Sequence, residues 1–432
     1  MKAFTRVIYR CPSGRGDMEQ ESAIDYEHGG LPHIEPGECI GMNYYVIRKL
    51  GWGNFSTVWL CWQPYKHEFY AVKIIKSHED YSRFALDELK LLELVCKVGE
   101  VVRFVETFDL QKDTGTHICI VTEVLGHNLL YAIENMDYDN KSSERLRIQM
   151  VRDVARSLLQ GLAELEKCDI VHTDIKPENV LFTKSKQETC QEALAFIAKL
   201  LRGEKLSADE VCAIDDIERV RMTDERRFDL RCIMCQIVRH MRNIKSTDNE
   251  RCAVKIADLG NAGLGVNLRS LSEIQTLQYR SPESILRAGY DYTADVFSAA
   301  CTIFELATGN YLFDVRPQDT SLEEQEEHLT RMVLTLGDFP SEAFVDAPRY
   351  KVLFDECGKL RNPVDLAGCD KPGSPRPRPI YSLLTECYGW NDEDARGFSQ
   401  LLIKMLRMDP KKRVTAGECL QHDWLTAEWN HC

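Results

Sequence analysis

A short stretch near the middle of the chain, IVHTDIKPENVLF (170–182), gathers side chains suited to chemistry. Asp174 and Asn179 are five residues apart with Lys176 between them, and Pro177 fixes a turn. An aspartate in such a loop can orient a substrate hydroxyl and accept its proton. The lysine can neutralise a transferring phosphoryl group, and the asparagine oxygen can ligate Mg²⁺. This spacing therefore indicates phosphoryl transfer.

Three charged residues elsewhere in the chain complete the set that phosphoryl transfer needs. Lys73 lies in the strand-like run EFYAVKIIK, and Glu88 follows fifteen residues later in a helical pattern. A lysine that contacts phosphates needs a carboxylate to hold it, and a strand lysine paired with a helix glutamate provides one. Asp258 ends the short apolar run in KIADLG, where a second carboxylate can hold the metal ions that bridge phosphates.

Upstream of Lys73, the stretch LGWGNFSTVWL has the form G-x-G-x-x-S-x-V, with Gly51, Gly53, Ser56 and Val58 at the fixed positions. Glycines in a strand–turn–strand allow backbone N–H groups to come close to a phosphate. Alone, this pattern is as consistent with a structural turn as with a phosphate-binding loop. The strand lysine and the helix glutamate that follow it favour the phosphate-binding interpretation.

The runs around these residues predict the elements that position them. Residues 43–126 are rich in β-type runs around the glycine turn, and the pattern after Gly126 is largely helical. The lead-in 1–42 contains Gly, Pro and Glu without periodicity, so we expect it to be flexible. Within the β-rich part, one helix is predicted with these apolar residues near one face: Phe84, Leu86, Leu89, Leu92 and Val95.

Residues 184–251 form a distinct segment without proline and dense in charge of both signs. Two groups of apolar residues in it recur with a 3.6-residue period, so we predict a partly helical insert. Its pair Cys232–Cys235 has the spacing of a metal-binding pair, but no second pair lies at zinc spacing. The two periodic groups are Leu194, Ile197, Leu200 and Leu201, and Leu230, Ile233, Met234, Ile237, Val238 and Met241.

The order of these residues resembles that of the eukaryotic protein kinases from about residue 43 to residue 426, and Glu283 in SPE extends the series. The resemblance implies an α+β, bilobal kinase fold with a β-rich N-lobe and a mainly helical C-lobe that carries a helical insert. The implied divisions are a flexible extension (1–42), the N-lobe (43–126), the first part of the C-lobe (127–183), a spacer insert (184–251), the second part of the C-lobe (252–426) and a tail (427–432).

Four stretches resemble one kinase family in particular: GWGNFSTVWL, HTDIKPEN, DLGNA and IQTLQYRSPE are similar to the SR-protein kinases. That family phosphorylates serines in the Arg-Ser repeats of splicing factors, and a spacer separates its C-lobe where the insert falls here. The LAMMER (cell-division-cycle-like) kinases are the nearest alternative, because they share HTD and EEHLTRMVLTLG (326–337) is faintly like their motif. A kinase with another basic substrate and a pseudokinase scaffold are further alternatives.

The resemblance implies ATP and Mg²⁺ as cofactors and assigns roles to individual residues. Thr122 falls where a residue guards the inner part of the ATP pocket, at a place where the SR-protein kinases carry a bulky aromatic residue. The implied catalytic residues are Asp174, Lys176, Asn179, Lys73 and Glu88; the ATP-binding residues are Leu50, Gly51, Gly53, Ser56, Val58, Ala71, Lys73, Glu123 and Leu125; and the Mg²⁺ ligands are Asn179 and Asp258.

Thr173 lies where most kinases carry an arginine that pairs with a phosphate on the activation loop. Threonine has no positive charge, so it cannot form a charge-assisted pair with phosphate. We therefore expect activity without phosphorylation of that loop, which makes Ser270, Ser272 and Thr276 ordinary loop residues. The kinase resemblance also implies that Asp295 holds the catalytic loop, and it implies an ion pair between Glu283 and Arg413.

Substrate docking is expected in an acidic segment, because Arg-Ser repeats are strongly basic. The resemblance places this segment after a buried helix, and a solvated charged face is the alternative interpretation. Three departures from the family pattern, Asn310, Leu334 and Leu277, favour weaker or shifted docking. The candidate docking residues are Asp319, Glu323, Glu326 and Glu327.

Composition limits the remaining possibilities. The chain has 432 residues and a formal charge of −14, which disfavours binding to nucleic acid. No apolar run reaches the roughly 18 residues of a membrane span, so no membrane attachment is expected. The 17 scattered cysteines fit reduced thiols in the cytoplasm or nucleus, and we expect this protein in both compartments, as a monomer.

Overall fold

The computed structural model describes residues 7–8, 21–138, 140, 144–204, 223–242, 244, 253–265, 273–316, 318–364 and 378–426. Ser270, Ser272, the middle of the expected insert and the expected tail lie outside these residues. The chain forms two compact units. The sheet unit consists of Phe4–Asn135 and Leu181–Gly260, and the helical unit consists of Met1–Ala3, Met136–Val180 and Asn261–Cys432.

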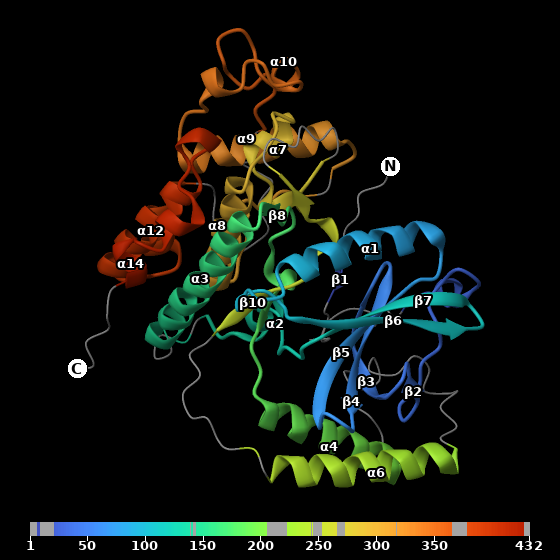
Figure 1. Ribbon diagram of the computed structural model, residues 1–432. Coiled ribbons are helices and arrows are strands. Elements are labelled where there is room, and N and C mark those ends of the chain that lie inside the picture. The colour runs from blue at the N-terminus through green and yellow to red at the C-terminus, as the bar shows by residue number, and fades with distance from the viewer. Residues whose placement is uncertain are drawn as a thin grey trace. The chain divides into compact units, whose positions relative to one another are not determined.

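The sheet unit is built on an antiparallel sheet with the strand order β1-β3-β4-β5-β7-β6, and β2 also pairs with β3 (Figure 1). Every residue of β4 is buried, because alternate side chains enter two apolar clusters on opposite faces. Trp59 and Cys61 belong to one cluster, and Leu60 and Trp62 belong to the other. The strands are β1 (Val7–Ile8), β2 (Cys39–Ile40), β3 (Tyr44–Gly53), β4 (Ser56–Gln63), β5 (Glu68–Ile75), β6 (Phe104–Lys112) and β7 (Gly115–Thr122).

Two helices of the insert, α4 (Lys186–Arg202) and α6 (Asp224–Met241), pack side by side against the second face of this sheet (Figure 1). The predicted helical periodicity is therefore confirmed. Ile197 from α4 and Ile233 from α6 are buried with Ile47 and Leu60 of the sheet. The insert thus shares a core with the sheet. The sheet unit also contains β10 (Val254–Ile256), the short α2 (Leu129–Asn135) and all of β9 (Val180–Phe182) except Val180, although we had assigned residues 127–183 and 252–426 to the C-lobe.

Residues 21–42 of the extension that we expected to be flexible are packed onto the sheet unit, so that prediction was wrong for this part. Leu31 and Ile34 are buried. Glu21 pairs with the buried ammonium of Lys49, at 2.8 Å, and Asp25 pairs with Lys76, at 2.5 Å. The Gly- and Pro-rich composition of this segment did not reveal its two apolar anchors.

Helix α1 (Glu79–Leu94) forms where a helix was predicted, and the side chain of His78 caps its first turn. Leu89, Leu92 and Val95 are buried as expected, whereas Phe84 and Leu86 are about half exposed. The buried side of α1 instead includes Ala85 and Glu88. Glu88 is held inward because it has a cationic partner in the sheet.

The helical unit is organised around α3 (Glu144–Lys167) and α8 (Thr293–Thr308). Every residue of α8 is buried, which is typical of a helix surrounded by other elements. No described helix has both the length and the apolar character to cross a membrane. The other elements are β8 (Ile170–Val171), β11 (Gly263–Leu264), α7 (Pro282–Leu286), α9 (Ser321–Leu336), α10 (Tyr350–Leu353), α11 (Ile380–Ser382), α12 (Asp392–Met405), α13 (Ala416–Cys419) and α14 (Asp423–Thr426).

Candidate active site

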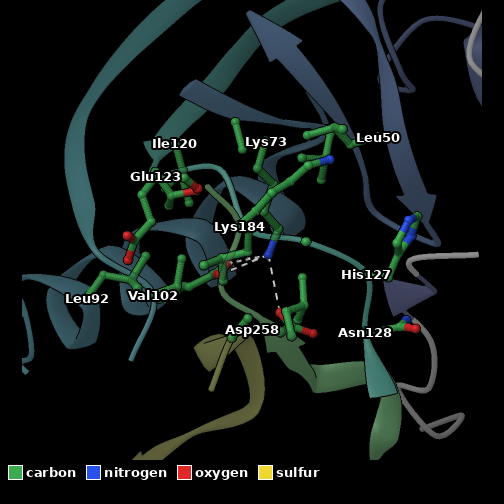
Figure 2. Close-up of a pocket in the computed structure, with 18 of the residues that line it drawn as sticks. Leu50, Lys73, Leu92, Val102, Ile120, Glu123, His127, Asn128, Lys184 and Asp258 are labelled. Carbon is green, nitrogen blue, oxygen red and sulfur yellow. Dashed lines mark hydrogen bonds and ion pairs between the residues drawn. The ribbon is translucent and has the colours of Figure 1, made fainter. Parts of the chain in front are cut away.

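A pocket in the sheet unit gathers most of the residues assigned to ATP (Figure 2). Strands β3, β4 and β5 contribute one side, and the segment after β7 contributes Glu123 and Leu125. Thr122 also lines the pocket, as expected for the residue that guards its inner part. The assigned residues that line it are Leu50, Val58, Ala71, Lys73, Glu123, Leu125 and Asp258.

The glycine turn connects β3 to β4 but does not line the pocket in this structure. Gly51 pairs with Val58 and Gly53 pairs with Ser56 in the ladder, and an irregularity interrupts the register between Lys49 and Gly51. The side chain of Ser56 is buried. Phosphate binding by Gly51, Gly53 and Ser56 therefore stays a prediction.

Lys73 is the centre of the charged end of the pocket. Its ammonium lies 2.8 Å from both carboxylate oxygens of Glu88 and 3.3 Å from Oδ1 of Asp258 (Figure 2). Burial raises the pKa of Glu88 and the nearby Asp258 adds to that rise, whereas the positive charge of Lys73 opposes it. The predicted lysine–glutamate pair is therefore present, and Asp258 joins it.

The segment after β7 is fixed at both ends, which leaves its backbone in a defined position. The N–H of Glu123 donates to the carbonyl of Arg103, and its carboxylate accepts from Lys255, at 2.6 Å. The N–H of Gly126 donates to the carbonyl of Phe182, at 2.7 Å. The carboxylate of Glu123 is thus used structurally, which agrees with an ATP contact through the backbone alone.

The helical unit brings Asp174, Lys176 and Asn179 together in one buried cluster. The ammonium of Lys176 lies 2.7 Å from Oδ2 of Asp174, and the amide of Asn179 donates to the carbonyl of Asp174, at 2.8 Å. Thr276 also donates to Oδ1 of Asp174, at 2.7 Å, and accepts from Lys176. We had expected Thr276 to be an ordinary loop residue, and this contact corrects that interpretation.

Thr173 has a positive φ of 66° and links the catalytic loop to two other segments. Its hydroxyl donates to the carbonyl of Asn261, at 2.8 Å. The N–H groups of Thr173 and His172 donate to the two carboxylate oxygens of Asp295, at 2.8 and 2.6 Å. The predicted role of Asp295 in holding this loop is therefore supported by direct contacts.

Protonation of Asp295 should limit activity at acid pH. Burial raises the pKa of Asp295 to about 6, although the two N–H donors favour its charged form. The pKa of an aspartate in the unfolded chain is about 4. Between about pH 4 and pH 6 the folded protein therefore binds this proton more tightly than the unfolded chain does. The contribution of Asp295 to stability therefore falls as the pH rises across that window. The two N–H groups are held best by the ionised carboxylate, so we expect kcat to fall as the pH drops through about 6.

A pH–rate profile recorded beside the melting temperature at each pH would check this expectation. The Asp295→Asn variant should be less active but should lose the acid limb near pH 6. If activity and melting temperature fall together at acid pH, general unfolding explains the profile and Asp295 does not.

Gln275 is a second residue that sequence reasoning missed. It is buried with a positive φ of 68°, and its amide donates to the carbonyl of Ala294 and to Ser298. Its side-chain oxygen accepts from both the N–H and the hydroxyl of Ser281, and from Ser284 at 2.7 Å. One glutamine thus ties the end of the activation segment to helix α8 and to helix α7.

The predicted pair of Glu283 and Arg413 is present and fully buried. The guanidinium contacts the carboxylate through two bonds, at 2.6 and 2.8 Å, and both side chains have no exposed surface. Arg413 also donates to the backbone carbonyls of Thr293 and Arg407. This pair fixes α7 to the segment that precedes α13.

The four candidate docking residues do not form one exposed acidic patch. Glu323 belongs to a capping box with Thr320 at the start of α9. Glu326 is buried and accepts from Asn362, and Glu327 is buried and pairs with Arg331, at 2.8 Å. Asp319 is exposed. Docking by these four residues stays a prediction, and the packing of α9 does not favour it for Glu326 and Glu327.

Known proteins with similar sequences identify the family. The model of the protein kinase domain matches residues 44–197 and 240–425, and the gap lies within the insert. SRSF protein kinase 3 of Mus musculus is 30% identical over 95% of this chain and 91% of its own length. Serine/threonine-protein kinase SRPK of Physarum polycephalum is 32% identical over 95% of this chain and 92% of its own length. The chain belongs to the SR-protein kinase family.

As a member of the SR-protein kinases, this chain is a serine/threonine protein kinase. A crystal structure of a kinase domain has a TM-score of 0.64, with 23% identity, over 91% of this chain and 98% of its own. This likeness confirms the expected kinase fold, with a β-sheet part and a mainly helical part. Protein kinases in general use ATP and Mg²⁺.

Proposed function

We propose that this kinase transfers the γ-phosphoryl group of ATP to serines in Arg-Ser-rich splicing factors, and that it does so without a phosphate on its activation loop. The names of several relatives point to this substrate class. The formal charge of −14 suits strongly basic substrates. The observation that carries the second part is the support of the catalytic loop by Thr173 and Asp295, which uses no cation that would need a phosphate partner.

The contacts of Asp174 suit an aspartate that orients a serine hydroxyl and accepts its proton. Lys176, Thr276 and Asn179 restrict its carboxylate, so little reorganisation is needed when a substrate binds. Lys176 also places a positive charge where negative charge develops on the phosphoryl group. In the sheet unit, Glu88 holds the ammonium of Lys73 in the position suited to ATP phosphates.

The side chains assigned to Mg²⁺ have the chemistry that this ion prefers. Oδ1 of Asn179 is buried and has no hydrogen-bond partner within the described residues, so its lone pairs are available to a cation. Asp258 offers a carboxylate in the ATP pocket. Amide and carboxylate oxygens are suitable Mg²⁺ ligands. When bound, Mg²⁺ would neutralise charge on the ATP phosphates.

Internal contacts take over the task that an activation-loop phosphate performs in other kinases. Thr173 joins the catalytic loop to Asn261 through a neutral hydrogen bond. Gln275 fixes the end of the activation segment by bonds to α8, Ser281 and Ser284. None of these contacts involves a charged group that requires a phosphate partner. The active arrangement is therefore expected to form in the unmodified chain.

Phosphate transfer to two peptides tests both parts of the proposal. Enzyme treated with phosphatase is assayed on an Arg-Ser repeat peptide and on a matched Lys-Ser peptide, with Asp174→Ala as the blank. We expect arginine-dependent transfer at the rate of the untreated enzyme. Transfer to neither peptide would contradict the substrate. Activity that phosphatase abolishes, and that rephosphorylation of the loop restores, would contradict the constitutive state.

A further inference from the structure

The ATP pocket has further cations besides Lys73 that none of the roles above explains. Arg48 on β3 and Lys184 just before α4 both line the pocket, as do His127 and Asn128. Their side chains are 23% and 12% exposed, so both cations are partly buried at the pocket. We call Arg48 and Lys184 the cationic edge.

A single carboxylate from the insert joins both members of the cationic edge. Oε2 of Glu192 lies 3.2 Å from the Arg48 guanidinium and 2.5 Å from the Lys184 ammonium. Without it, two like charges would face one another beside the pocket. Burial lowers the pKa of His127, and the charges of Lys184 and Arg48 lower it further, while Glu192 opposes them. The imidazole is therefore neutral at physiological pH and does not add to the edge.

The position of Glu192 is set by the way the insert folds. A capping box between Ser185 and Glu188 fixes the first turn of α4 directly after Lys184. Cys190 and Ala193, on either side of Glu192 in sequence, are buried in the core shared with the sheet. Glu192 itself is 42% exposed and lies on the side of α4 that reaches Arg48. The insert thus presents one carboxylate to the pocket from a rigid helix.

We propose that Glu192 is a positioning residue through which the insert sets the affinity of this kinase for ATP and ADP. The proposal rests on the pocket being the ATP site. The carboxylate neutralises Arg48 and Lys184 and holds their side chains to α4. Without it, both cations would be released beside a pocket that binds a polyanion, and their field would attract the nucleotide. Glu192 therefore weakens nucleotide binding and favours release of ADP.

The Glu192→Gln variant tests this proposal. We expect its Kd for ATP and for ADP, measured by calorimetry at low salt, to fall about threefold, the scale of an exposed ion pair. The KM for ATP should fall with the Kd. The difference in Kd between wild type and the variant should shrink as the salt concentration rises, because salt screens the cationic edge. Glu192→Asp keeps the charge and should bind more like wild type. Glu225→Gln in α6 makes the same charge change elsewhere in the insert and should leave the Kd unchanged.

Three outcomes would overturn the proposal, and they can be told apart. If Glu192→Gln lowers the melting temperature but leaves both Kd values unchanged, Glu192 has only a structural role. If wild type itself binds no ATP, the proposed function fails first, before any variant is compared. Adding Arg48→Gln and Lys184→Gln to the Glu192→Gln variant should remove the gain in affinity, and a gain that persists would exclude the cationic edge as its cause.

Discussion

Replacing Asp174 by Asn is expected to lower kcat by about 10²–10⁴-fold, the range that a positioned acid–base group contributes. The amide keeps the shape of the carboxylate but removes its negative charge and its ability to accept a proton. Lys176, Thr276 and Asn179 all donate to the carboxylate of Asp174, so it is held ready for a substrate hydroxyl. Steady-state kinetics on an Arg-Ser peptide would measure the change.

Binding of ATP provides the control for this variant. Asp174 is not among the residues that line the ATP pocket, so the Kd for ATP should be unchanged. An unchanged melting temperature would show that the loop still folds. A variant that kept kcat within about tenfold of wild type would show that Asp174 does not act on the hydroxyl.

Breaking the buried pair of Glu283 and Arg413 is expected to have the largest effect on stability. The Arg413→Met variant should lose about 3–5 kcal/mol, because it leaves a buried carboxylate without a partner. The guanidinium also satisfies the carbonyls of Thr293 and Arg407, and its Cζ lies 5.2 Å from the centroid of the Phe297 ring. Urea unfolding followed by fluorescence would measure the loss.

A matched pair on the surface is the control for that measurement. Arg396 pairs with Asp392 at 2.9 Å, but both side chains are more than half exposed, so Arg396→Met should leave the unfolding midpoint unchanged. The double variant Glu283→Gln with Arg413→Met should lose less than the sum of the single variants, because they share one interaction. Losses that simply add would show that the two residues do not stabilise the fold as a pair.

The residues whose roles depend on type and order along the chain were predictable from the sequence. Lys73 and Glu88 were assigned to a pair because a strand lysine and a helix glutamate occur in that order, and they are in contact. The partner of Glu283 came from the family resemblance. The helices of the insert followed from their apolar periodicity, because burial on one face alone is enough to produce that pattern.

Contacts between distant segments could not be read in this way. Thr276 meets Asp174 across 102 residues, and nothing near Thr276 in the sequence marks it. The hydrogen bonds of Gln275 likewise depend on where α8 lies in the fold. The acids of α9 were assigned to substrate docking, with a solvated charged face as the alternative, but Glu327 turns inward to an arginine one turn away. Local patterns give the elements, and packing decides which side chains meet.

The ion pair between Glu21 and Lys49 has a consequence for where the folded kinase begins. Lys49 is 1% exposed, and its ammonium lies near the Trp52 and Trp59 rings, at 5.9 and 5.2 Å. A chain cut at residue 43, where the kinase pattern starts, would keep this cation in its apolar surroundings and remove its carboxylate. Removing one partner of a buried ion pair is strongly destabilising. A recombinant fragment for crystallisation or inhibitor screening therefore has to include Glu21.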